Sequence, residues 1–118
     1  MGILVIGSRD KKQIGRSELK EISATFGNFV KAVVDIEKKI MAIGGELHAD
    51  EETLLLEEGS KQPELWGINL YPELQGDDFI EFDSVINLRP AQGNRTRAVD
   101  DAQIREKIKE IVNSLILP

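Results

Sequence analysis

The strongest constraint on the fold is an apolar stripe at helical spacing near the C-terminus. Its members are Ile104, Ile108, Ile111, Val112 and Leu115. They recur at i, i+4, i+7, i+8 and i+11, which is one face of an α-helix. Asp100 is expected to cap this helix, with Gln103 three residues later as in a capping box. A helix of this kind buries its apolar face against another layer, so we expect a sheet beneath it.

Short runs of β-branched and aromatic residues, bounded by turn residues, predict the strands of that sheet. The expected strands span 3–6, 29–36, 40–43, 65–71 and 79–88. The stretch 29–43 also fits one helical face, but its β-branched residues and its polar break favour a hairpin.

Two shorter helices are expected between these strands. Ser17 and Asp50 are candidate N-caps, and Gly27 and Gly59 are candidate terminators. The polar and basic segment 7–16 is expected to be a loop. The resulting fold class is α+β, in the order β-α-β-β-α-β-β-α. We expect a mostly antiparallel sheet of about five strands, covered on one face by three helices.

Length and composition predict a single domain over residues 1–118. The chain contains no cysteine, which excludes disulfides, thiolate metal sites and a cysteine nucleophile. No apolar run is long enough to span a bilayer, and the apolar start is too short for a signal peptide. These features predict a cytoplasmic protein without a membrane partner.

The charged residues are sorted along the chain. Residues 46–83 hold twelve acids and a single base, Lys61, whereas the remainder holds 14 bases and nine acids. The formal net charge of −6 argues against nonspecific nucleic-acid binding. The sorting predicts an acidic face against a basic one, either within one fold or between the subunits of a homodimer.

The clearest candidate binding segment is the basic stretch 89–97, which contains three arginines and no acid. The planar guanidinium group of arginine can form two parallel hydrogen bonds to a carboxylate or a phosphate. Gly93 and Asn94 tolerate positive φ angles, and such backbone conformations can expose N–H groups. The candidate ligand-binding set is Arg89, Gln92, Asn94, Arg95 and Arg97. Its expected partner is an anionic small molecule or an acidic protein surface. In the alternative, the arginines pair with Glu81, Asp83 or Asp100 and only fix the turn.

A second candidate site surrounds His48, the single histidine. If residues 46–48 are extended, Glu46 and His48 point to one face, and Asp50 joins them from the next turn. One histidine with carboxylates suits Mg²⁺ or Mn²⁺ better than structural zinc. In the alternative, His48 to Asp50 simply open a helix, where acids are favoured.

Two further features are weaker. Glu81 and Asp83 share one strand face, so with His48 they are candidates for a catalytic role. The single Trp66 and the single Tyr71 suit either a pocket rim or the core. The phosphate-binding loop, the dinucleotide fingerprint and the nucleophile elbow are all absent from the sequence.

Three strings in the sequence resemble those of an uncharacterised family of small prokaryotic proteins. The strings are GGELHADEE, WGINLYP and DFIEFDSVINLRPAQGNRTR. The resemblance runs from about Phe29 to Val112 and implies a prokaryotic intracellular protein, a domain of unknown function with no assigned activity. Two hypotheses therefore remain: a module that binds an anionic ligand through the arginine-rich loop, and a small metal-assisted, hydrolase-like enzyme that uses His48.

Overall fold

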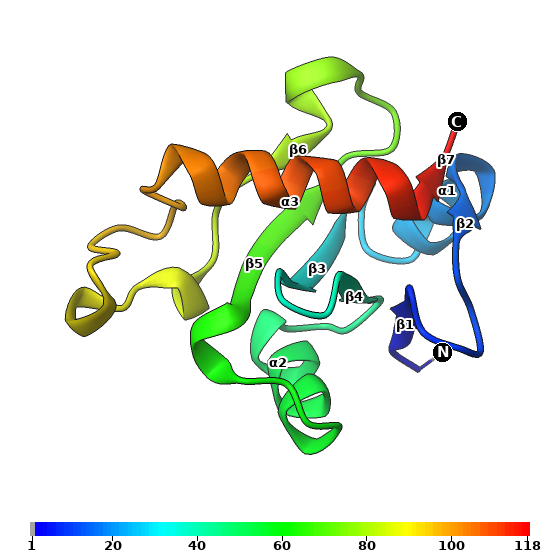
Figure 1. Cartoon of the computed structure of the whole chain (residues 1–118). Helices are drawn as coiled ribbons and strands as arrows, with labels where there is room; N and C mark the ends of the chain where they lie inside the picture. The colour runs from blue at the N-terminus through cyan, green and yellow to red at the C-terminus, as the bar shows by residue number, and fades with distance from the viewer. Residues whose placement is uncertain (1) are drawn as a thin grey trace.

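The computed structural model describes residues 2–118. Its centre is a five-stranded antiparallel sheet in the order β1-β4-β3-β5-β6 (Figure 1). The strands are β1 (Leu4–Ile6), β3 (Val30–Asp35), β4 (Ile40–Ile43), β5 (Leu65–Leu70) and β6 (Ile80–Glu81). The predicted hairpin is confirmed, because β3 and β4 pair antiparallel.

Three α-helices and four 3₁₀ turns connect these strands in the described part of the chain. The helices are α1 (Arg16–Ala24), α2 (His48–Glu57) and α3 (Ala102–Leu115). The 3₁₀ turns are η1 (Gln62–Glu64), η2 (Gly76–Asp78), η3 (Val85–Asn87) and η4 (Pro90–Gln92). With these elements the predicted α+β fold class is confirmed, and the element order matches the prediction apart from two short additional strands.

One pairing was not predicted. Two residues of the expected loop 7–16 form β2 (Ile14–Gly15), which runs parallel to β7 (Ile116–Leu117) directly after α3. A two-residue strand has no periodicity that a sequence pattern could reveal.

The helices cover both faces of the sheet, not one as predicted. Val30, Ala32 and Val34 of β3 belong to a core that includes residues of α1 and α3. Val33, on the opposite face, belongs to a smaller core with Leu55 of α2. Figure 1 shows α3 crossing one side of the sheet while α2 lies on the other side. Because α2 is a single short helix, it leaves part of this face of the sheet uncovered.

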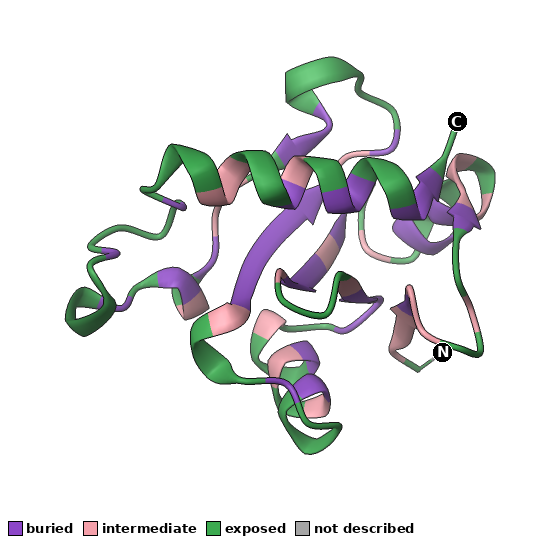
Figure 2. Ribbon diagram, in the orientation of Figure 1, coloured by how far each residue is buried: buried purple, intermediate pink, exposed green. Residues whose placement is uncertain are grey.

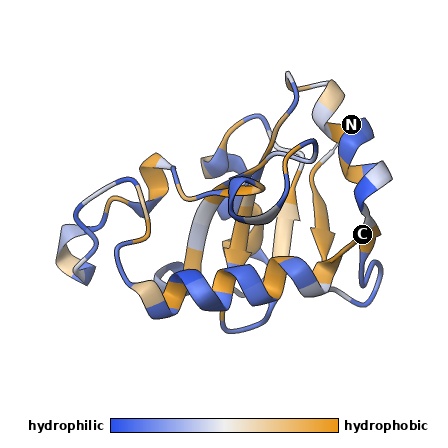
Figure 3. Cartoon of the chain, turned by 90° about the horizontal axis from the view of Figure 1, so that it is seen from above, coloured by the Kyte–Doolittle hydropathy of each residue, from blue (hydrophilic) through white to orange (hydrophobic). Residues whose placement is uncertain are grey.

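Helix α3 has the predicted amphipathic face. Ile108, Ile111, Val112 and Leu115 are buried, and the outward residues are exposed (Figures 2 and 3). The cap is Asp101 rather than Asp100: its side chain accepts a hydrogen bond from the Gln103 N–H.

The starts of the other helices also differ from the prediction. Helix α1 begins after Gly15 instead of Ser17, and α2 begins after Leu47 instead of Asp50. No side chain caps either start. The residue preferences of the N-cap position were therefore a poor guide to where these two helices begin.

The predicted strand over 79–88 is wrong beyond Glu81. The Ser84 hydroxyl oxygen accepts a hydrogen bond from the Ile86 N–H and turns the chain into η3. The Asn87 side chain then reaches the free edge of β5, where it accepts from the Gly67 N–H at 2.8 Å and donates to the Gly67 carbonyl at 2.9 Å. One side-chain amide thus replaces the neighbouring strand that β5 lacks at this point.

Among residues 2–118, no helix has the length and apolar character needed to cross a membrane.

Candidate functional site

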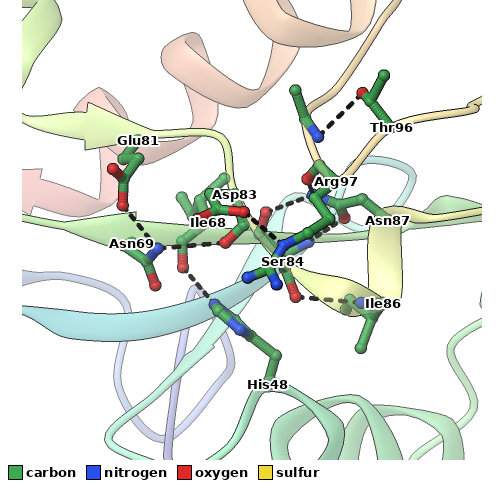
Figure 4. Close-up of polar contacts among 12 residues, drawn as sticks. His48, Ile68, Asn69, Glu81, Asp83, Ser84, Ile86, Asn87, Thr96 and Arg97 are labelled. Atoms are coloured by element: carbon green, nitrogen blue, oxygen red, sulfur yellow. Dashed lines mark hydrogen bonds and ion pairs between the residues drawn. The ribbon is translucent and has the colours of Figure 1, made fainter.

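A cleft of about 590 Å³ opens on the part of the sheet that α2 leaves uncovered. The start of α2, the strands β3, β5 and β6, and the segment 83–86 form its walls. Its charged and polar lining includes Lys31, His48, Asn69, Glu81, Asp83 and Arg97. Figure 4 shows several of these side chains around the Ile68 carbonyl.

The strand register explains why these residues meet. Lys31 lies opposite Asn69, and Asn69 lies opposite Glu81, so three adjacent strands place one polar row on the same face. Two residues further along, the rings of Phe29 and Tyr71 stack with centroids 5.7 Å apart. The cleft therefore has a polar floor beside an aromatic wall.

His48 lies half-buried at the first position of α2. Its Nε2 lies 2.8 Å from the Ile68 carbonyl oxygen, which fixes the ring orientation (Figure 4). Burial lowers the pKa of His48 and the nearby Lys31 charge lowers it further, whereas the Ile68 carbonyl, Asp83 and Asn69 oppose the decrease in pKa. At neutral pH the ring is uncharged, so Nε2–H donates to Ile68 and Nδ1 carries the lone pair.

The two carboxylates of the cleft have different partners. Glu81 Oε1 accepts hydrogen bonds from Asn69 Nδ2 at 2.9 Å and from the Tyr71 hydroxyl at 3.0 Å. Burial, followed by the Glu81 carboxylate, raises the pKa of Tyr71, so that hydroxyl remains a donor. Asp83 Oδ1 forms an ion pair with Arg97 Nε at 2.8 Å.

The ammonium group of Lys31 has a different environment. It donates a hydrogen bond to the Glu46 carbonyl oxygen at 2.8 Å, and it forms no ion pair with a carboxylate of residues 2–118. Asn69 is 7% exposed, and its Oδ1 is buried without a hydrogen-bond partner among the described residues. Buried polar atoms of this kind are rare and need a specific explanation.

We expect the titration of the His48 ring to report on this environment. In an NMR titration, the pKa of His48 should lie below 6.5. Lys31→Gln should raise the pKa because it removes a repelling positive charge, and Asp83→Asn should lower it. Lys107→Gln, on the exposed face of α3, is the control and should have no effect. Equal titration curves for all variants would contradict the electrostatic account of the cleft.

The predicted anion-binding set is not gathered at one surface. Arg89 is 9% exposed and lies over the Trp66 ring, 4.6 Å from its centroid. Its guanidinium donates to the carbonyl oxygens of Ile86 and Leu65, and burial lowers its pKa. Arg89 therefore completes the edge of β5 as Asn87 does. Trp66 itself is a core residue.

Asn94 is also used internally, because its Nδ2 donates to three backbone carbonyl oxygens. Gln92 donates to the Pro63 carbonyl oxygen at 2.9 Å, and the exposed Arg95 uses its backbone N–H to bind Asp100. Of the five predicted residues, Arg97 lines the cleft, where it pairs with Asp83. That pairing is the alternative that the sequence left open.

The predicted metal set is separated. Helix α2 begins at His48, so His48 and Asp50 are two positions apart on a helix and point to different sides. Glu46 and Asp50 line a hollow near Thr25 and Phe26, away from the cleft that His48 lines. Within residues 2–118, no group of three or more His, Asp or Glu side chains is placed to hold a metal ion.

The candidates for a catalytic role do meet. His48, Glu81 and Asp83 all line the cleft, although Glu81 and Asp83 are not on one continuous strand. Lys31 and Asn69 also line the cleft and were not predicted from the sequence. Lys31 was detectable in principle, because it is a lone charged residue in an otherwise apolar run.

Comparison with known proteins places the chain in one family. A family model described as a protein of unknown function (DUF5674) matches residues 9–115. Neither the comparison with curated proteins nor the comparison with solved structures gave a match. The family model covers nearly the whole chain, and the chain therefore belongs to the DUF5674 family.

Proposed function

We propose that this protein binds a small organic molecule carrying an anionic group in the His48 cleft. The observation that carries the proposal is the ammonium group of Lys31, which lies in the cleft and has no carboxylate partner in the described chain. The proposed anion site is therefore the cleft beside Lys31 and His48, and not the loop 89–97 that the sequence predicted.

The balance of charge inside the cleft supports an anionic group at the Lys31 end. Arg97 offsets the charge of Asp83, and two neutral donors hold the Glu81 carboxylate. At the His48 ring, the charge of Lys31 has a larger effect than the charge of Asp83. Among the described residues, Lys31 is therefore the cation of the cleft that no ion pair offsets.

The start of α2 adds to the positive charge of Lys31. Residues 47–49 line the cleft, and no side chain caps the helix there. Uncapped N–H groups and the helix dipole favour a negative charge at this position. The buried Asn69 Oδ1 is an unused acceptor in the same cleft and would take a hydrogen bond from a donor group of the ligand, not from its anionic group. The apolar wall of Phe29 and Tyr71 would contact the organic part of the ligand.

We place this activity in the cytoplasm of a prokaryote, and we retain the homodimer as a proposal. The chain has no cysteine and therefore no disulfide, as is usual in reducing compartments. The exposed acids of α2, Asp50 and Glu57, support a second partner surface, because they take part in no ion pair within residues 2–118.

Three ligands of equal shape and different charge test the proposal: benzoate, benzamide and benzamidine. In ¹H–¹⁵N spectra, benzoate should shift the amide signals of Ala49 and His48 most, and benzamidine should shift them least. Lys31→Gln should weaken benzoate binding about fivefold, the equivalent of about 1 kcal/mol.

The matched control is Lys107→Gln, which removes an equal charge from the far side of the sheet. It should leave benzoate binding unchanged. Preferential binding of benzamidine would overturn the proposal, as would benzoate shifts confined to residues outside the cleft.

A hydrolase-like enzyme is the second candidate. It is favoured by the presence of His48, Glu81 and Asp83 in one cleft, where the neutral ring offers a lone pair to accept a proton. Hydrolysis of 4-nitrophenyl acetate should then be lost in His48→Gln and retained in Glu46→Gln, because Glu46 lines another hollow. Equal rates in both variants would contradict this candidate.

A further inference from the structure

A second hollow, separate from the cleft, gathers positive charge. It has a volume of about 520 Å³ and lies where the loop after β1, the β3–β4 turn and the end of α3 meet. Three exposed cations line it: Arg9 and Lys12 from the loop and Lys39 from the turn. No carboxylate is among its lining residues.

These three cations are not compensated by ion pairs. Over residues 2–118, Arg9, Lys12 and Lys39 form none, whereas their neighbour Lys11 pairs with Glu18 at 3.3 Å. The whole chain carries a formal net charge of −6, so acids are plentiful elsewhere. Like charges that share one hollow repel each other, and a bound anion would remove that repulsion.

The loop that carries Arg9 and Lys12 is held firmly in place. Gly7 has a φ of +94°, and a Cβ at this position would lie 2.9 Å from the Lys39 carbonyl oxygen. The Gly7 N–H donates to the Lys11 carbonyl oxygen at 2.8 Å, and the Ser8 hydroxyl donates to the Val5 carbonyl oxygen at 3.1 Å. Only a residue without a side chain lets the loop approach the turn this closely.

The third cation occupies an unfavourable backbone position. Lys39 has a φ of +59°, in the left-handed region that glycine and asparagine favour in such turns. The turn is otherwise well formed, because Asp35 Oδ1 accepts from the N–H groups of Glu37 and Lys38. A lysine at a position better suited to glycine points to a use for its charge.

We propose that Arg9, Lys12 and Lys39 bind a multivalent anion of the phosphoryl class. The guanidinium offers two parallel donors to phosphate oxygens, and the two ammonium groups supply the remaining charge. The proposal does not depend on the function of the His48 cleft, since the two sites share no lining residue.

The test is a titration with inorganic pyrophosphate at low ionic strength, followed by amide signals of residues 7–13 and 39. The double variant Lys12→Gln/Lys39→Asn should bind pyrophosphate at least about tenfold more weakly, since it loses two charge-assisted contacts. Lys39→Asn should not lower the melting temperature, because asparagine tolerates the left-handed conformation. A purely structural role for Lys39 would predict a lower melting temperature instead.

Lys11→Gln is the control within the same loop, because Lys11 pairs with Glu18 and does not line the hollow. It should bind pyrophosphate like the wild type. Glucose 6-phosphate tests whether the phosphoryl group belongs to an organic ligand or to free phosphate. Tighter binding of glucose 6-phosphate than of inorganic phosphate would indicate a phosphorylated organic ligand. Equal or weaker binding of glucose 6-phosphate would indicate free phosphate. The absence of pyrophosphate shifts in this hollow would overturn the proposal, as would equal weakening by Lys11→Gln.

Discussion

Replacement of Asn87 by alanine is expected to remove about 3–5 kcal/mol from the free energy of unfolding, because it leaves several buried backbone groups without partners. The Asn87 side chain is fully buried. It bonds both the N–H and the carbonyl of Gly67, and it also donates to the Arg97 carbonyl oxygen at 2.9 Å. A domain of this size has a total stability of about 5–15 kcal/mol, so the variant should lose a large share of it. Urea unfolding measures the effect.

Two further variants separate the hydrogen bonds from simple loss of volume. Asn87→Asp keeps the size and the acceptor but loses the two N–H donations, so it should be destabilised nearly as much at neutral pH. Asn113→Ala, at an exposed position on α3, is the matched control and should change stability by less than about 0.5 kcal/mol. If Asn87→Asp lowers the free energy of unfolding only slightly, the two N–H donations of the Asn87 amide contribute little to stability.

The stability of the protein is expected to fall as pH rises from about 4.5 towards about 9, because of Glu51. This carboxyl is fully buried against the sheet, where Oε2 accepts from the Gly45 N–H at 2.9 Å. Burial raises its pKa to about 9, so the folded protein holds a proton that the unfolded chain releases near pH 4.5. The stabilisation is complete below the unfolded pKa and is lost progressively as pH approaches the folded one.

Glu51→Gln should remove this dependence, since the amide can accept the same hydrogen bond without a charge. At about pH 8 the variant should exceed the wild type in stability by about 2–4 kcal/mol, and at about pH 5 the gain should shrink or vanish. Glu57→Gln, on the exposed side of the same helix, should follow the wild type at both pH values. A Glu51→Gln variant with the same pH slope as the wild type would show that Glu51 is ionised in the folded protein.

The elements predicted correctly from the sequence are those whose signal is local. The stripe from Ile104 to Leu115 specified α3, and the β-branched runs around 37–39 specified the hairpin of β3 and β4. The strand predicted over 79–88 failed because Asn87 and Arg89 complete the edge of β5 across a sequence separation of 20 residues or more. No local pattern encodes such a contact.

The candidate site was predictable in part for the same reason. His48, Glu81, Asp83 and Arg97 were named from the sequence and do line one cleft. Arg89 and Asn94 have the residue types of a binding loop, but burial commits their donors to backbone carbonyls. The row of Lys31 and Asn69 depends on strand register, which alternation alone does not specify.

The side chains that complete β5 also decide where this sheet can grow. A strand edge with free N–H and carbonyl groups invites pairing with another chain, which is a route to aggregation and to strand exchange. At Leu65 and Gly67 those groups are already bonded to Arg89 and Asn87. A strand from another polypeptide could therefore not pair with β5 at this point and would have to join the sheet at one of its outer strands, β1 or β6.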